Sequence, residues 1–290
     1  MPNLRISAIS FLNTAPLMWD FEHGDAGGDF EIDYTIPSAC AAALAANQAD
    51  IGIIPAFTYA QIPGLVILPN IAIASKDRVR SILLISKKPI NDVRTVAADT
   101  SSRTSVALLQ VLFAKFFGGP RELTPQAPNL DEMLRHHDAA LLIGDAALQV
   151  PPDAGHHLYD LAHLWHEATG QRFVFAFWAV RLDALDRKPA ANGGGAGNVS
   201  VDLAKVFQQS RDHGLEPASL AVIAREWSLK LGLGEDDIRS YLTENIHYFL
   251  DRESHAGLKL FLQYSQEIGL IPAIPDLRFL GPLAFAGARK

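Results

Sequence analysis

The sequence is poor in cysteine, in charged residues and in long apolar runs, and each shortage excludes a class of protein. Cys40 is the one cysteine among 290 residues, so the chain can form no internal disulfide. Charged residues make up 20% and the formal net charge is −7, which argues against a general nucleic-acid-binding protein. No apolar run reaches about eighteen residues, so we expect no membrane-spanning helix. The opening "MPNLRISAIS" has no apolar core and no small-residue cleavage site, so we expect a cytoplasmic protein without a secretion signal.

Motifs for metal ions and for nucleotide phosphates are also missing. The ten histidines include adjacent pairs at 136–137 and 156–157, whose side chains point to different faces in regular structure. His163 and His166 could share one helix face, but no HExxH motif or cysteine accompanies them, and we expect no metal site. The glycine-rich stretch 188–198 lacks the Lys-Ser/Thr pair of a phosphate-binding loop, and we interpret it as a flexible loop.

What the sequence does contain is a regular alternation of short apolar segments with helical patterns. Residues 4–9 and 30–36 are predicted strands, and an alanine-rich helix follows from about Ser38. Alternation of this kind predicts an α/β fold with mainly parallel sheets. From about residue 199 onward the pattern is helical, with one predicted helix over 235–250.

We expect the chain to form two lobes with a ligand cleft between them. The larger lobe would comprise residues 1–90 and 183–290, including the helical tail, and the smaller lobe residues 91–182. The chain would cross between the lobes near residues 86–95 and 172–182. Ligands of α/β sheets bind where the carboxyl ends of strands meet the N-termini of helices, so the cleft would lie at this edge.

Polar segments break the pattern after four predicted strands, at 10–14, 37–40, 99–105 and 143–147. The carboxyl ends of parallel strands lie at one edge of a sheet, so all four segments can face one cleft. The free N–H groups of a helix N-terminus favour an anion, and the negative net charge means that an anion site must be built locally in this way or by an arginine. Each segment alone is also explained as an ordinary helix cap, because Ser and Thr are common there.

These breaks supply the candidate site residues. Arg103 is either a partner for a substrate carboxylate or a solvated arginine at a helix start. Cys40 is interpreted as a small buried side chain rather than a nucleophile, since no suitably spaced histidine accompanies it. The expected substrate-binding residues are Ser38, Ala39, Ser81, Ser102, Arg103, Thr104, Ser105, Ile143 and Gly144.

Several segments together are similar to the chorismate dehydratase family. They include "RISAISFLNTAPL", "ADIGIIPAFTYA", "DTSSRTSVALLQVL" and "DLAHLWHEATGQRFVFAFWAVR", and the resemblance runs from Arg5 to about Arg181. It implies the two-lobed fold of type 2 periplasmic solute-binding proteins, used as a cytoplasmic carbon–oxygen lyase of the futalosine route to menaquinone. The implied reaction converts chorismate to 3-[(1-carboxyvinyl)oxy]benzoate and water. Because aromatisation drives this reaction, no cofactor is expected.

For this reaction, the catalytic candidates are Ser10, Asn13 and Asp145. Ser10 and Asn13 would contact the ring substituents from the tip of the first strand. An amide is a very poor base, so Asn13 is expected to orient a hydroxyl or a carboxylate. The proton acceptor is either the enolpyruvyl carboxylate of the substrate itself or Asp145, although an ionised Asp145 would be repelled by a dianion. Asp145 is alternatively a helix N-cap.

Two other functions stay open from the sequence. The first is synthesis of 1,4-dihydroxy-6-naphthoate in the same pathway, by a family that typically has histidine where this chain has Gly144 and that lacks the "SFLNT" segment. The second is a non-catalytic protein that binds a small anion in the same cleft. No nucleic-acid or membrane partner is expected, and the sequence does not predict the oligomeric state.

Overall fold

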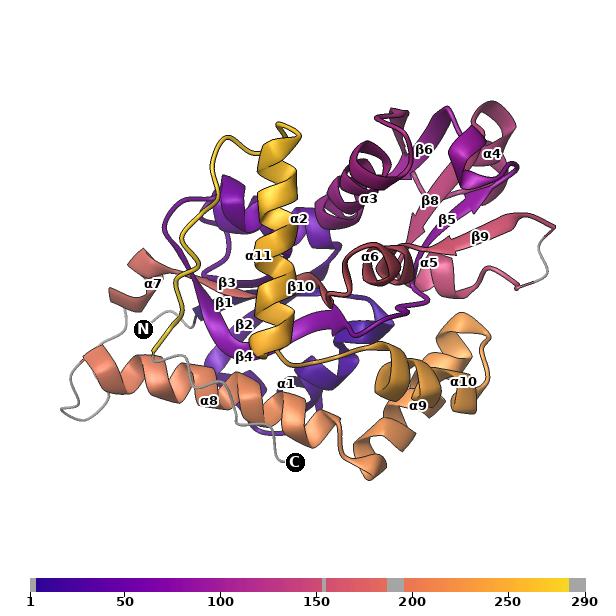
Figure 1. Ribbon diagram of the computed structural model, residues 1–290. Helices are drawn as coiled ribbons and strands as arrows, with labels where there is room; N and C mark the ends of the chain where they lie inside the picture. Colours follow the sequence, from indigo (N-terminus) through magenta and orange to yellow (C-terminus); the bar gives the residue numbers. More distant parts are fainter. Residues whose placement is uncertain (1–3, 153–154, 187–195, 282–290) are drawn as a thin grey trace.

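The computed structural model describes residues 4–152, 155–186 and 196–281, which form two five-stranded sheets with helices around them (Figure 1). The first sheet has the strand order β2-β1-β3-β10-β4. Its strands are β1 (Leu4–Ile9), β2 (Phe30–Thr35), β3 (Ile51–Pro55), β4 (Leu65–Ser75) and β10 (Phe173–Arg181). The central strands β3 and β10 are almost completely buried, as is usual for strands with both faces of the sheet covered.

The second sheet has the strand order β7-β6-β8-β5-β9. Its strands are β5 (Ile82–Ser86), β6 (Thr95–Asp99), β7 (Glu122–Gln126), β8 (Ala139–Ile143) and β9 (His157–Asp160). The central strand β8 is buried along its whole length, whereas the edge strands β7 and β9 are partly exposed. The second sheet therefore has its own apolar centre.

Both sheets mix parallel and antiparallel pairs, so the expectation of mainly parallel sheets is correct only for part of each. β1 pairs in parallel with β2 and β3, and β6 pairs in parallel with β7 and β8. The antiparallel pairs all involve β5 or β10. Each of these two strands is the first strand after the chain crosses from one sheet to the other. Each runs antiparallel to both of its neighbours in the sheet that it joins.

The crossings lie earlier in the chain than expected. β4 ends at Ser75 and β5 begins at Ile82 in the other sheet, so the first crossing covers residues 76–81. The second crossing lies between β9 and β10 and contains α6 (Leu161–Thr169). Sheet pairing thus places β5 in the smaller lobe and β10 in the larger lobe. The predicted lobe boundaries at residues 90 and 182 assign each strand to the other lobe. Both strands are mostly apolar, and such sequences fit either sheet equally well.

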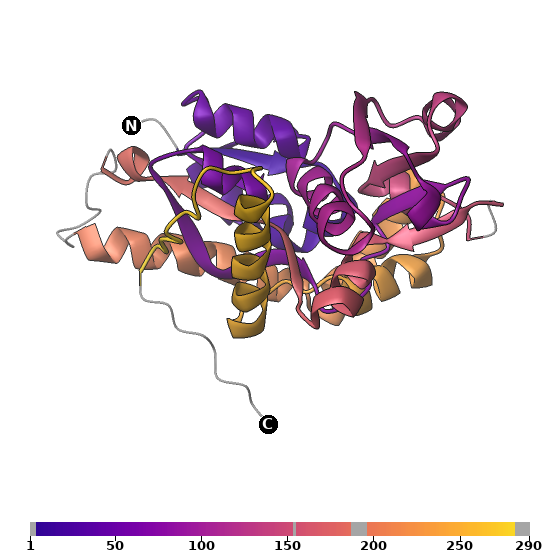
Figure 2. The same ribbon diagram turned by 45° about the horizontal axis from the view of Figure 1, so that its top comes forward.

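The helices cover the sheets and close the larger lobe. The helices not yet named are α1 (Trp19–His23), α2 (Pro37–Ala45), α3 (Arg103–Phe116), α4 (Leu130–His136), α5 (Asp145–Leu148), α7 (Leu182–Asp186), α8 (Ala196–Gly214), α9 (Pro217–Leu231), α10 (Glu235–Ser240) and α11 (Arg252–Glu267). Figures 1 and 2 show α8 along one side of the first sheet and α11 across one of its faces, where α8 contacts β4 and α11 contacts β10.

The glycine-rich stretch 188–198 lies largely outside the described residues. Within the described ranges, no helix has both the length and the apolar character needed to span a bilayer.

The first polar break is held firmly against the helical tail. It continues into a 3₁₀ helix, Leu12–Met18, which contacts α8 and α9. The Ser210 hydroxyl of α8 donates a hydrogen bond to the Leu17 carbonyl at 2.9 Å. Gly214, at the end of α8, lies so close to the Pro16 carbonyl that a Cβ there would overlap it. The helical tail therefore fixes the position of the segment that follows β1.

The predicted helix over 235–250 is shorter than expected. α10 is followed by one π-helical turn, Tyr241–Asn245, and the chain then becomes extended. It does so because His247 exchanges backbone hydrogen bonds with Ala74 at the end of β4, at 2.8 and 2.9 Å. Pairing with the first sheet ends the helix, and the sequence pattern alone does not reveal this pairing.

Candidate active-site cleft

Residues from four separate segments meet in a small cavity between the two lobes. They are the polar residues Asn13, Ser81 and Ser102, together with Gly144. Phe11, Ile143 and Phe175 contribute to its apolar walls. The cavity has a volume of about 30 Å³, which is room for about one or two water molecules and far below the roughly 300–1,000 Å³ of an ordinary ligand site. The lobes are therefore closed on each other at this part of the cleft.

Backbone N–H groups of the larger lobe hold the cleft closed by donating to the smaller lobe. The Leu12 N–H donates to Oδ1 of Asp145 at 3.0 Å. The Ser38 N–H, at the start of α2, donates to the Ser101 carbonyl at 2.9 Å. These are the kinds of donors that the sequence predicted for an anion, and in the closed state they bind protein oxygens instead.

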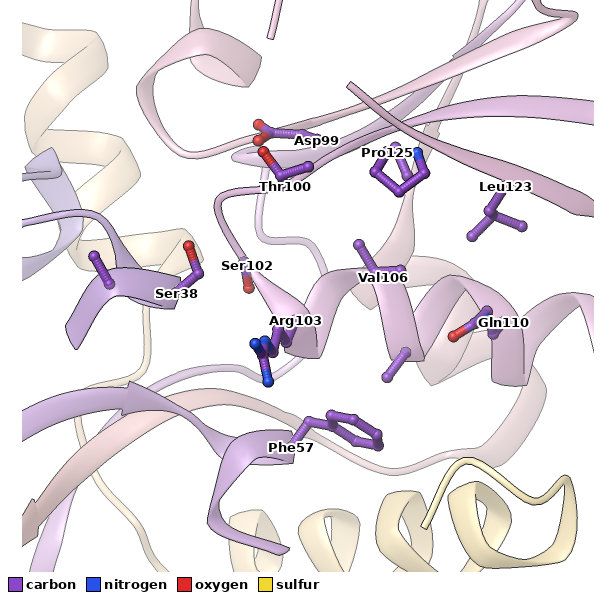
Figure 3. Close-up of a pocket in the computed structure, with 13 residues that line it drawn as sticks. Ser38, Phe57, Asp99, Thr100, Ser102, Arg103, Val106, Gln110, Leu123 and Pro125 are labelled. Atoms are coloured by element: carbon purple, nitrogen blue, oxygen red, sulfur yellow. The ribbon is translucent and has the colours of Figure 1, made fainter. Parts of the chain in front are cut away.

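A larger cavity of about 650 Å³ adjoins the cleft at Ser102 (Figure 3). The starts of α2 and α3 face each other across it, with Ser38 on one side and Ser102 and Arg103 on the other. The Arg103 guanidinium donates to Oε1 of Gln61 at 3.1 Å. Further along α3 the wall is apolar except for Gln110, and Leu123 of β7 belongs to it. This cavity therefore offers hydroxyl groups and one cation at the end nearest the cleft.

Asp99 lies at the end of β6 in the same cavity and is almost completely buried. Its Oδ1 accepts a hydrogen bond from the Ser101 N–H at 2.8 Å, while its Oδ2 has no hydrogen-bond partner among the described residues. Burial raises the pKa of the Asp99 carboxyl, and backbone N–H groups of Ser101 and Ile143 oppose that shift. Asp99 thus ties together the two polar turns of the smaller lobe.

A third cavity, of about 480 Å³, lies on the other side of the cleft and contains Ser10 and Asp145. Phe11 lines both this cavity and the cleft, so its ring forms part of the wall between them. The Ser10 hydroxyl donates to the Thr35 carbonyl at 3.3 Å. In the closed state, Ser10 and Asp145 therefore face a flanking cavity rather than the cleft itself.

The wall between these cavities requires glycine at position 144. Gly144 has a φ of +66°, a conformation that residues with a side chain rarely adopt. A Cβ at this position would lie 2.7 Å from two carbons of the Phe11 ring. Both the backbone angle and the packing of Phe11 exclude a larger residue.

Asp145 bridges the lobes and is not a helix N-cap, which corrects that alternative. The N-cap position of α5 belongs to Gly144, and Asp145 is the first residue of the helix. Burial raises the pKa of the Asp145 carboxyl to about 6, and the Leu12 N–H and the Lys230 charge act in the opposite direction. Asp145 is therefore a group that titrates close to neutral pH at the contact between the lobes.

The structure brings most of the predicted site residues together and places two of them outside the three cavities. The cleft contains Asn13, Ser81, Ser102, Ile143 and Gly144, and the cavity of Figure 3 contains Ser38, Ala39, Ser102 and Arg103. Thr104 and Ser105 line none of the three cavities described above. Oγ1 of Thr104 accepts from the Phe57 N–H at 3.0 Å, and Ser105 donates to the Ser102 hydroxyl, which caps α3. Local sequence patterns do not reveal Phe11 or Tyr241, whose roles depend on contacts between distant segments.

Nucleophilic cysteine and metal chemistry find no support in the described residues. The Ser7 hydroxyl donates to the sulfur of Cys40 at 3.2 Å, and burial raises the pKa of this thiol to about 12, as expected for a packed side chain. Among the residues that the structure describes, no group of three or more His, Cys, Asp or Glu side chains could hold a metal ion. His163 instead pairs with Asp77, at 2.6 Å.

Comparisons with known proteins give both a family and a fold. A family model described as "Menaquinone biosynthesis" matches residues 4–267. A relative from Thermus thermophilus, named chorismate dehydratase, is 28% identical over 251 residues, which cover 81% of this chain and 86% of the relative. This sequence match covers both lobes and most of the helical tail.

Solved structures show that the fold is that of periplasmic binding proteins. The protein AF1704 from Archaeoglobus fulgidus superimposes with a TM-score of 0.67 at 18% identity, covering 93% of this chain and 98% of the other. The periplasmic aliphatic sulphonate binding protein SsuA from Escherichia coli superimposes with a TM-score of 0.63 at 16% identity, covering 98% and 99%. The expected two-lobed α/β fold is therefore confirmed.

The contact between Phe11 and Gly144 predicts a strong effect of a single methyl group. Gly144→Ala is expected to lower the free energy of unfolding by about 1–3 kcal/mol, because it strains the backbone and displaces the Phe11 ring. Urea denaturation measures this loss. In the background of Phe11→Ala the same substitution should cost less, since only the backbone strain remains. An equal cost in both backgrounds would contradict the packing argument.

The raised pKa of Asp145 predicts how stability changes with pH. The folded protein holds the Asp145 proton up to about pH 6, whereas the unfolded chain releases it near pH 4. The contribution of Asp145 to stability therefore falls as pH rises from about 4 to about 6 and then levels off. Asp145→Asn keeps an oxygen for the Leu12 N–H but cannot titrate, so the stability of wild type relative to this variant should fall over that interval. A difference that is constant from pH 4 to pH 7 would show that the Asp145 pKa is normal.

Proposed function

The chain belongs to the menaquinone biosynthesis family, and we propose that within this family it is a chorismate dehydratase. The observation that carries the proposal is the similarity to the chorismate dehydratase of Thermus thermophilus, which spans 81% of the chain. The proposed protein is a carbon–oxygen lyase of the futalosine route and acts in the cytoplasm. Its reaction removes the ring hydroxyl and one ring hydrogen of chorismate as water, and leaves 3-[(1-carboxyvinyl)oxy]benzoate.

Binding of a dianion would use the groups that now hold the cleft closed. The part of the cleft beside Asn13 is too small for a substrate ring at about 30 Å³, so the lobes must separate there to admit it. Separation frees the N–H groups of Leu12 and Ser38 from Asp145 and Ser101. A carboxylate accepts hydrogen bonds from such groups at least as well as a carbonyl does. Arg103, next to Ser102 at the edge of the cleft, supplies the cation for a substrate carboxylate.

The ring of the substrate is proposed to lie against Asn13 and Ser81. Both residues line the cleft, and both offer polar atoms of fixed position. Holding the departing hydroxyl and the neighbouring hydrogen in a reactive geometry can contribute about 7–11 kcal/mol in favourable cases. A donor that meets developing negative charge can contribute about 3–4 kcal/mol more. Aromatisation supplies the driving force, so the proposed reaction uses no cofactor.

The enolpyruvyl carboxylate of the substrate is the proposed base. The protein alternative, Asp145, lines the flanking cavity behind Phe11 and accepts the Leu12 N–H. The dianion would raise the pKa of Asp145 further and favour its neutral form. A role for Ser10 is supported less than one for Asn13, because Ser10 faces the same flanking cavity.

Position 144 favours the dehydratase over the related naphthoate synthase. A histidine there would overlap the Phe11 ring and adopt an unfavourable backbone angle. A purely binding function is the second candidate, and likeness to a sulphonate-binding protein at 16% identity supports only the fold.

Incubation with chorismate tests the proposed function directly. We expect conversion to an aromatic product that has lost one water, followed by absorbance and by mass spectrometry. Asn13→Ala is expected to lower kcat about 100- to 1,000-fold, since it removes a preorganised polar group beside the reacting atoms. If chorismate raises the melting temperature of the protein but no product is released, the protein would be a binding protein. Near-full turnover by Asn13→Ala would remove Asn13 from the mechanism.

Asp145→Asn separates the two candidate bases. If the substrate carboxylate takes the proton, this variant should keep at least about a tenth of the wild-type kcat, because the introduced amide oxygen still accepts the Leu12 N–H. Calorimetric titration with chorismate shows whether the variant still binds. Loss of turnover with intact binding would instead identify Asp145 as the base.

A further inference from the structure

Tyr241 is a buried residue of the helical tail whose hydroxyl reaches the cleft residues. Its side chain is 2% exposed. It begins the π-helical turn Tyr241–Asn245, in which the Ile246 N–H donates to the Tyr241 carbonyl at 3.2 Å. A π-helical turn is rare and is often found at functional sites, because it shifts one side chain out of the regular helical pattern.

Two cleft residues from distant segments share the Tyr241 hydroxyl. The hydroxyl donates a hydrogen bond to the Ser81 Oγ at 2.9 Å. The side chain of Asn13 is also hydrogen-bonded to it. Asn13 belongs to the segment after β1 and Ser81 to the first crossing, and both line the cleft. One phenol therefore connects three parts of the chain directly behind the candidate site.

This connection fixes which groups the cleft presents. A Ser81 oxygen that accepts from Tyr241 keeps its own O–H free to donate elsewhere. The single proton of the phenol is donated to Ser81, so the Asn13 side chain can bond to the Tyr241 oxygen only through its amide N–H. The Asn13 carbonyl oxygen is then available as an acceptor. The chain of hydrogen bonds runs in one direction, from the Asn13 amide through Tyr241 to Ser81.

We propose that Tyr241 is a positioning residue that holds Asn13 as an acceptor and Ser81 as a donor toward the substrate. This inference rests on the proposed function. Tyr241 itself does not contact the substrate.

The phenol keeps its proton at any working pH. Burial raises the pKa of Tyr241, and the nearby Asp145 carboxylate acts in the same direction, whereas Arg80 opposes it. A neutral phenol both donates and accepts, which a chain of this kind requires. Linked hydrogen bonds in a dry interior strengthen one another, so loss of the central group affects both neighbours.

Tyr248 provides a matched control for Tyr241. It lies in the same part of the chain and its side chain is also 2% exposed, but its hydroxyl has no hydrogen-bond partner among the described residues. Substitution of either tyrosine by phenylalanine removes one buried hydroxyl and leaves the ring. A general effect of such a loss on the core would appear in both variants.

Steady-state kinetics with chorismate test the inference. Tyr241→Phe is expected to lower kcat about 10- to 100-fold, with KM changed less than threefold, because small misplacements of reacting groups cost about that much. Tyr248→Phe is expected to keep kcat within twofold of wild type. Equal kcat values for wild type and Tyr241→Phe would overturn the inference and leave the proposed function intact.

A double-mutant cycle with Ser81→Ala distinguishes positioning from a general structural effect. If Tyr241 acts through Ser81, the loss of kcat in the double variant should be clearly smaller than the product of the two single losses. Independent effects would multiply, and that outcome would overturn the inference.

A wild-type protein that does not convert chorismate would refute the proposed function, and the inference about Tyr241 would then be decided by structure. Crystal structures of Tyr241→Phe and Tyr248→Phe show the side-chain orientations of Asn13 and Ser81. These should change in the first variant only. Unchanged orientations in Tyr241→Phe would overturn the inference.

Discussion

Hydrogen bonds across the cleft determine the state of the whole site, above all the bond from the Leu12 N–H to the Asp145 carboxylate. Similar bonds join Ser38 to Ser101 and Phe57 to Thr104. Each has a net value of only about 0.5–1.5 kcal/mol, because water satisfies the same groups when the lobes part. Closure is thus reversible at modest cost. A ligand that carries carboxylates competes for the same N–H groups. The same hydrogen-bond donors therefore serve both ligand binding and closure of the lobes.

The sequence predicted the edge of the fold where the site lies, because the signals there are local. Polar residues at 10–14, 99–105 and 143–147 interrupt apolar strands, and an apolar strand that ends in hydroxyl and amide groups marks the rim of a sheet in any α/β fold. Asn13, Ser102 and Gly144 from these breaks do meet in one cavity.

The lobe boundaries were not predictable in the same way. β5 and β10 are apolar except at their last residues, Ser86 and Arg181, and nothing in such a strand tells which of two sheets it joins.

Contacts between distant segments account for the rest of what the sequence could not predict. Phe11 looks like an ordinary apolar residue until its ring is seen against Gly144, more than a hundred residues away. Tyr241 lies in a pattern that fits a continuous helix, and this pattern shows neither the pairing of His247 with β4 that ends the helix nor the contact of the phenol with Ser81. The edge strands β7 and β9 are partly exposed and polar, so they carry little periodicity. A residue's role that depends on packing between distant segments thus cannot be recognised from the local sequence.

The charge state of the carboxyl groups beside the cleft decides both whether a dianion can bind and which group can act as the base. The protein has a net charge of −7, so a dianion can be bound only where negative charge is locally absent. Asp99 and Asp145 lie in the cavities beside the cleft, and burial raises the pKa of both carboxyl groups. An approaching dianion raises these values further and favours neutral carboxyls. A neutral Asp145 repels no substrate, but it also cannot take a ring proton. In the proposed reaction, the condition that admits chorismate therefore leaves the substrate's own carboxylate as the base.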